Sequence, residues 1–226
     1  MFTAAFLSLI TILFFTPVSA IAENLTQKTV DFGAPSALEG GIPAGWELKK
    51  WSGKPVITVE KENALRLFSD KSSFGIGKEV KLNTTDYPYI QWRWKVTKLP
   101  EGADVRVKNA NDQAAQLYLV FPKFPSTINS RVIGYIWDST APEGTCLDSP
   151  VSPNIKYIVV RSGKNQIGKW VAENRNVHQD YRTLFGEEPP MLEKVFVMID
   201  SDNTKTVAES YFDGIQFQKR TVAALP

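Results

Sequence analysis

Short apolar segments alternate with turn-forming residues along most of the chain. Runs rich in Val, Ile, Tyr, Phe and Trp are separated by clusters of Gly, Pro, Asn and Asp, at spacings typical of β-sandwiches. No segment with a helical period rivals them, so helix is expected only in brief turns such as Gln179–Phe185. The predicted strands are Val56–Glu60, Ala64–Phe68, Tyr89–Val96, Ala115–Phe121, Val132–Trp137, Ile155–Val160, Val195–Asp200 and Glu209–Phe217.

The clearest alternation lies between Tyr89 and Val96. Ile90, Trp92 and Trp94 occupy every second position, with polar residues between them, which predicts a half-buried strand whose indoles point inward. We therefore expect an all-β fold, a two-sheet antiparallel β-sandwich with little helix. A single domain over residues 23–226, with its packed core at about 46–217, fits the length of the chain.

Residues 1–22 have the composition of a secretory signal peptide. They carry no charged side chain, and an apolar run from Ala4 to Phe15 precedes Pro17 and small residues. Cleavage after Ala20 or after Ala22 fits the small-x-small rule. We expect export to the periplasm or the medium, with an uncleaved N-terminal anchor as the alternative, and no membrane span once the signal is removed.

Composition narrows the classes of function. Hydrophobic residues make up 43% of the chain, which favours a packed globule over disorder. Lys and Arg total 26 against 24 for Asp and Glu, and no dense basic block occurs, so a nucleic-acid partner is not expected. Cys146 is the one cysteine, which leaves no internal disulfide. One His and one Cys do not make a protein-only zinc site.

Two kinds of site rest on acidic residues. Asp200 and Asp202 offer alternating oxygen ligands for calcium in the stretch 200–204, although Lys205 and Tyr211 do not fit an EF-hand loop; the alternative is a polar turn between strands. Paired carboxylates would instead indicate a glycosidase-type enzyme acting on envelope or extracellular polysaccharide. The candidates for that role are Asp112, Glu173, Asp180 and Asp202. The lone His178 is expected to have a structural or surface role.

Several stretches in collinear order resemble the bacterial family catalogued as domain of unknown function 3047. The matching positions are Trp46, Trp51, Gly53, the stretches 91–95, 111–115, 118–121, 134–137 and 200–204, then Trp170, Glu173, Arg175, Asn176, Val177, Asp180, Tyr181, Arg182, Phe185, Gly186, Ala208, Tyr211, Asp213, Gly214 and Ile215. The resemblance implies an exported protein similar to galactose-binding-like jelly rolls. It supplies no catalytic residue. The family usually shows two adjacent acids where this chain has Asn111 and Asp112, which weakens a metal or acid-base role for the first position.

The leading functional hypothesis is a non-catalytic module that binds carbohydrate or another envelope component. Aromatic plates would stack on sugar rings while polar groups hold the hydroxyls. The proposed ligand-binding residues are Arg93, Asp112, Gln113, Trp137, Trp170, Arg175, Tyr181 and Asp202. Each also fits a structural role: Trp137 and Trp170 in the core, Arg175 paired with Asp180, and Asp112 at a turn. An envelope assembly or scaffold protein, recognisable by a contiguous exposed apolar patch, is a further alternative.

Overall fold

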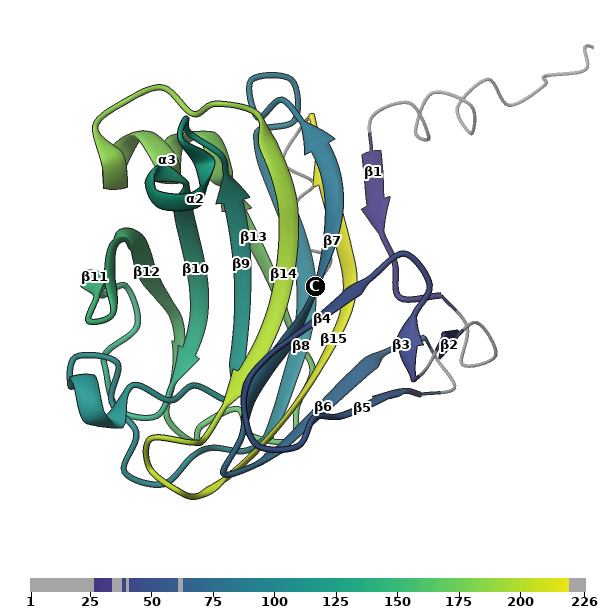
Figure 1. The fold of residues 1–226 in the computed structure, drawn as a ribbon, viewed down its shortest axis with the longest axis vertical. Coiled ribbons are helices and arrows are strands. Elements are labelled where there is room, and N and C mark those ends of the chain that lie inside the picture. The colour runs from purple at the N-terminus through teal and green to yellow at the C-terminus, as the bar shows by residue number, and fades with distance from the viewer. Residues whose placement is uncertain (1–26, 34–37, 40, 61–62, 220–226) are drawn as a thin grey trace, which may run out of the picture.

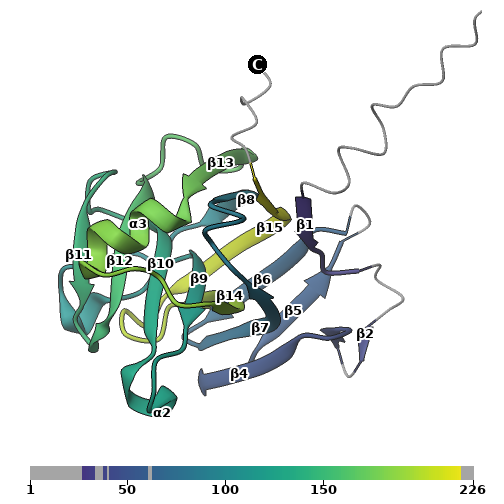
Figure 2. The ribbon, with the colours of Figure 1, turned by 90° about the horizontal axis from the view of Figure 1, so that it is seen from above.

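The computed structural model describes residues 27–33, 38–39, 41–60 and 63–219. The predicted signal peptide at 1–22 lies outside the described residues. Two sheets face each other across one core, and Figure 2 shows them from above as two layers. No helix in the described part of the chain is both long and apolar enough to cross a membrane.

Within the described ranges one sheet has six strands and the other has seven (Figure 1). The six-stranded sheet has the order β13 (Val171–Asn176), β8 (Tyr89–Lys98), β15 (Val207–Gln218), β6 (Leu65–Asp70) and β5 (Val56–Val59), with β1 (Gln27–Val30) paired to β15. The seven-stranded sheet has the order β11 (Cys146–Ser149), β12 (Ser152–Ser162), β10 (Arg131–Asp138), β9 (Ala115–Phe121), β14 (Leu192–Asp200), β7 (Ser73–Leu82) and β4 (Glu47–Ser52). A small hairpin pairs β2 (Leu38–Glu39) with β3 (Ile42–Pro43).

Eight of these strands have the order of a jelly roll. We number these strands 1 to 8 along the chain, so that β6 to β10 are 1 to 5 and β13 to β15 are 6 to 8. One sheet then has the order 6-3-8-1 (β13, β8, β15, β6). The other has the order 5-4-7-2 (β10, β9, β14, β7). This double Greek-key arrangement confirms the expected β-sandwich. One feature departs from a purely antiparallel sheet: β10 and β12 run parallel, because β12 lies between β10 and the edge strand β11.

Each of the eight predicted strand segments coincides with a strand, except that Glu60 lies just after β5 and Ala64 just before β6. The indoles of β8 point inward as expected. Trp92 and Trp94 are at most 1% exposed. The indole of Trp92 stacks on Tyr135 with ring centroids 5.2 Å apart, and Trp94 lies 5.9 Å from Trp137. Because Tyr135 and Trp137 belong to β10 of the other sheet, these ring contacts join the two layers through the centre of the core.

The nine-residue helix α3 (Val177–Phe185) covers one end of the sandwich near the predicted helical turn (Figure 1). Asn176 caps it by accepting a hydrogen bond from the backbone N–H of Gln179 at 2.9 Å. Gly186 ends it in the left-handed conformation, with φ of 68°. Tyr181 is fully buried and its ring packs against Phe121. The short helix α2 (Ser126–Asn129) lies in the connection from β9 to β10.

The carboxylate of Glu173, on the edge strand β13, is buried. The Glu173 carboxylate accepts bonds from the Trp94 indole at 2.9 Å and from the Arg161 guanidinium at 2.6 and 2.9 Å. Burial raises the pKa of Glu173, while the charge of Arg161 acts in the opposite direction. The Glu173 side chain is only 6% exposed, so water screens its ion pair with Arg161 only weakly.

We predict that Glu173→Gln lowers the free energy of unfolding by about 3 kcal/mol, because it removes the buried carboxylate that accepts both Arg161 bonds and leaves only the exposed Glu143, 3.6 Å away, beside that charge. The matched control is Asp213→Asn, which removes the partner of the half-exposed Arg93 and should cost less than about 1 kcal/mol. Urea unfolding of both variants measures the difference. Equal losses would contradict the buried character of the first pair.

Candidate functional site

A row of small and aromatic residues crosses the outer face of the seven-stranded sheet. Pairing across five strands places Gly77, Phe196, Tyr118, Gly134 and Tyr157 at one level. Side chains directly opposite one another on neighbouring strands lie on the same face of a sheet. The row therefore holds two glycines and three aromatic rings, with Phe196 and Tyr118 side by side.

The glycines let the rings lie close to the sheet. A Cβ atom on Gly77 would meet the Phe196 ring at 2.6 Å, and one on Gly75 would meet it at 2.5 Å. A Cβ atom on Gly134 would come within 2.6 Å of both Tyr118 and Tyr157, whose rings stack with centroids 6.1 Å apart. Any larger residue at these glycines would push the rings away from the sheet.

A groove of about 470 Å³ lies above the part of this row that Gly77, Phe196 and Tyr118 form. Tyr118 and Phe196 line its floor, together with Val120, Val132 and Ile155. The edge strand β4 forms one wall, where Trp51 is 49% exposed and packs edge-on against Phe196 at 5.8 Å. We call this the Trp51 groove; its lining residues are Glu47, Leu48, Lys49, Trp51, Gly77, Tyr118, Val120, Val132, Ile155, Lys194 and Phe196.

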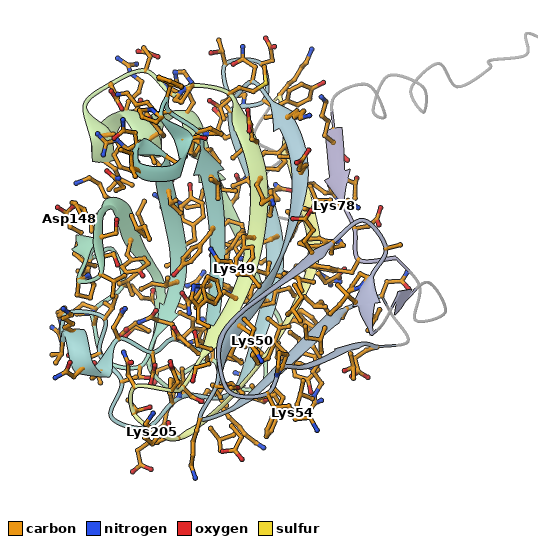
Figure 3. All side chains as sticks on the ribbon, viewed as in Figure 1. Lys49, Lys50, Lys54, Lys78, Asp148 and Lys205 are labelled. Atoms are coloured by element: carbon orange, nitrogen blue, oxygen red, sulfur yellow. The ribbon has the colours of Figure 1, made fainter. Side chains whose placement is uncertain are left out.

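Charged groups surround the aromatic wall of the groove. The Lys49 ammonium lies 5.0 Å from the centroid of the Trp51 ring, and Figure 3 places Lys49 in front of the sheet. Lys194 donates to the Glu47 carboxylate at 2.9 Å. These groups combine a flat apolar surface with hydrogen-bond donors and an acceptor, which suits a ligand that has both apolar faces and hydroxyl groups.

Four of the predicted site residues, Asp112, Gln113, Asp200 and Asp202, lie together where β14 ends and β9 begins. Carboxylate oxygens of Asp112, Asp200 and Asp202 all lie within 4.8 Å of one another. Burial raises the pKa of Asp200 well above its usual range, and the Asp112 charge acts in the same direction. Gln113 donates its backbone N–H to Asp200 at 2.6 Å. Carboxylates at this spacing are typical calcium ligands, and calcium binding stays a prediction.

Asp112 also organises the turn after β14. Its carboxylate accepts the backbone N–H groups of Asn203 at 3.1 Å and Thr204 at 2.6 Å, and the Thr204 hydroxyl at 2.6 Å. Asp112 is fully buried, so these bonds fix the 200–204 turn to a side chain in the interior. The acidic cluster thus contains a turn-forming residue as well as the two residues predicted as calcium ligands.

Arg93 and Trp170 lie on the outer face of the six-stranded sheet, on the opposite side of the sandwich from the groove. Arg93 pairs with Asp213, and its guanidinium lies 5.4 Å from the centroid of the Trp170 ring. Lys95 lies 4.1 Å from the centroid of the Tyr211 ring and 5.1 Å from that of Trp170. The two candidates are neighbours, but they share no surface with the Trp51 groove.

The last three candidates belong to the interior and to one end of the sandwich. Trp137 is 1% exposed, and its indole N–H donates to the carbonyl of Gly163 at 3.1 Å. Tyr181 is buried under α3 and donates to Glu187 at 3.2 Å. Arg175 donates to both oxygens of Asp180, at 2.7 and 3.0 Å. The structure therefore does not bring the eight sequence-predicted ligand residues together at one site.

The residues of the Trp51 groove were missed because their signal is a pattern of glycines. Gly75 and Gly77 alternate with Phe74 and Ile76, so both glycines face the same side of β7. Such spacing indicates a sheet face that another group approaches closely. Residue type alone does not distinguish Trp51, Tyr118 and Phe196 from the aromatic residues of the core.

The fold and the site define a class of protein: a jelly-roll domain with an aromatic groove across one sheet. The chain belongs to the family described as a protein of unknown function (DUF3047), whose model matches residues 44–216. This confirms the family resemblance seen in the sequence. A search among curated proteins gives no match.

Solved structures with similar folds are remote in sequence. A family 11 carbohydrate-binding module of a cellulosomal cellulase of Clostridium thermocellum is 8% identical, with a TM-score of 0.43 over 88% of this chain and 98% of that one. A xyloglucanase domain of a type three effector from Sinorhizobium fredii is 9% identical, with a TM-score of 0.45 over 76% and 92%. A cleaved adhesin domain of Lys-gingipain is 11% identical, with a TM-score of 0.43 over 85% and 99%. Likeness at this level does not identify a ligand for this chain.

The close contact between Phe196 and the sheet predicts a strong coupling. Gly77→Ala should lower the free energy of unfolding by about 1–3 kcal/mol, because its methyl group overlaps the ring. In a double-mutant cycle with Phe196→Ala, the double variant should lose at least about 1 kcal/mol less than the sum of the single losses. Chemical denaturation measures all four proteins. Additive losses, within about 0.5 kcal/mol, would contradict the contact.

The acidic cluster predicts stabilisation by calcium. Millimolar calcium should raise the melting temperature of protein first treated with chelator, because a cation that binds only the folded chain favours it. Asp202→Asn should remove most of this shift. The control is Asp148→Asn, whose carboxylate lies on β11 and pairs with Lys156. An equal shift in both variants would place the calcium elsewhere.

Proposed function

We propose that this chain is an exported carbohydrate-binding protein without a catalytic role, and that its glycan lies in the Trp51 groove. The proposal of export rests on the composition of residues 1–22. The observation that carries the binding proposal is a half-exposed indole beside a floor of aromatic rings, with charged groups at the edge. Trp51 offers a flat apolar face to the apolar face of a sugar ring, and Glu47, Lys49 and Lys194 offer partners for hydroxyl groups.

The carboxylates support binding rather than hydrolysis at this groove. Glycoside hydrolysis normally requires two carboxyl groups that flank the scissile bond. Among the described residues that line the groove, Glu47 is the one carboxylate, and it pairs with Lys194. Glu173 and Asp180 are engaged with Arg161 and Arg175 away from the groove.

We predict that Trp51→Ala weakens glycan binding by at least about tenfold, because it removes the exposed aromatic wall. The matched control is Trp170→Ala, which removes a partly exposed indole from the opposite sheet and should leave affinity unchanged. A glycan array, followed by affinity electrophoresis in neutral and acidic polysaccharides, measures binding. Circular dichroism shows whether both variants fold.

The reverse pattern would contradict this location of the site. Loss of binding in Trp170→Ala but not in Trp51→Ala would assign the glycan to the face that carries Arg93 and Lys95. No binding by the folded wild-type protein to any glycan would overturn the proposed function and favour the scaffold alternative.

A further inference from the structure

The Trp51 groove does not end at its aromatic floor. A second depression of about 590 Å³ shares Val120 and Lys194 with it. The lining residues along β9 run from Tyr118 to Pro122, just after the strand, and span about 13 Å at roughly 3.3 Å per residue. The two depressions together therefore form one long channel that follows β9 and β14 towards the connection between β9 and β10.

An exposed aromatic ring lies at the far end of this channel. Phe124 lines the second depression and is 94% exposed. Its backbone carbonyl accepts a bond from the Asn129 side chain at 3.1 Å, and Ser130 bonds the carbonyl of Ser126 at 2.6 Å. Asn154 of β12 also donates to the carbonyl of Ile128 at 2.6 Å. Phe124 thus projects from a connection that hydrogen bonds tie to itself and to the sheet.

The charges along the channel select the class of ligand. Glu47, Glu79 and Glu193 line the two depressions together with Lys49 and Lys194. The lining holds two cations and three anions, and Glu79 also pairs with Lys81 at 3.6 Å, so the channel has no excess of positive charge to attract a uronate or phosphate chain. Ser126 and Ser130 add hydroxyl groups near Phe124. A neutral ligand rich in hydroxyl groups fits this lining.

We propose that the channel binds an extended segment of a neutral polysaccharide, with Trp51 stacking on one part of the chain and Phe124 on another. This inference rests on the proposed function, since it assigns a longer ligand to the same groove. Its distinguishing consequence is a dependence of affinity on chain length. Short saccharides reach the Trp51 wall alone, while longer ones also reach Phe124.

The test uses titration calorimetry of the full protein with cello-, manno- and laminari-oligosaccharides of increasing length, from disaccharides to hexasaccharides. For at least one series, the hexasaccharide should bind at least about tenfold more tightly than the disaccharide. Phe124→Ala should remove most of that gain and leave disaccharide binding unchanged. Trp51→Ala should weaken binding at every length. The matched control is Ile128→Ala, since Ile128 is 67% exposed on the same connection but lines neither depression.

Each failure has a different pattern. A hexasaccharide affinity that Phe124→Ala leaves unchanged, while Trp51→Ala still abolishes binding, would overturn the extended channel and keep the proposed function. Tighter binding of polygalacturonate than of any neutral chain would overturn the neutral ligand class. No binding of any saccharide by the wild-type protein would overturn both proposals.

Discussion

Four aromatic rings at the centre of the core set the orientation of both sheets. Trp92 and Trp94 of β8 meet Tyr135 and Trp137 of β10, at centroid distances of 5.2 and 5.9 Å. Side chains alternate strictly along a strand, so this contact decides which residues of each strand face outward. A shift of one residue in β8 would place its two indoles in solvent and Arg93 and Lys95 in the core. The contents of both outer faces therefore follow from the pairing inside.

That alternation gives the two outer faces opposite characters. Beside Trp92 and Trp94, the outward positions of β8 hold Arg93 and Lys95, and the six-stranded sheet presents charged groups and partly exposed aromatic rings. Between Tyr135 and the preceding Ile133, the outward position of β10 holds Gly134. The seven-stranded sheet consequently leaves room for rings to lie on its backbone. A hollow with an aromatic floor arises there, whereas long side chains cover the other sheet.

The strands that the sequence predicted have apolar residues at their inward positions and no run of glycines at their outward ones. β7 was not predicted, because Gly75 and Gly77 lower its strand propensity, although they are the positions that admit Phe196. β13 was not predicted either, since its inward side chains are Glu173 and Arg175, which have partners that only the folded chain provides. Residue type alone identified charged and aromatic candidates. It could not separate Trp51 at the groove from Trp137 in the core, because their exposure depends on strand order.

A buried polar network gives the groove a rigid floor. Gln116 donates to the Asp200 carboxylate at 2.9 Å and accepts the hydroxyl of Tyr118, which lies 3.2 Å from the hydroxyl of Tyr157. Burial raises the pKa of both tyrosines, so both hydroxyls keep their protons and can act as donors. Each ring is held by a glycine beneath it and by a hydrogen bond at its tip. A ligand that stacks above such rings meets a surface whose side-chain entropy is already lost on folding, which reduces the cost of binding. The same network begins at Asp200, so a change in the charge of the acidic cluster would reach the floor of the groove through two hydrogen bonds.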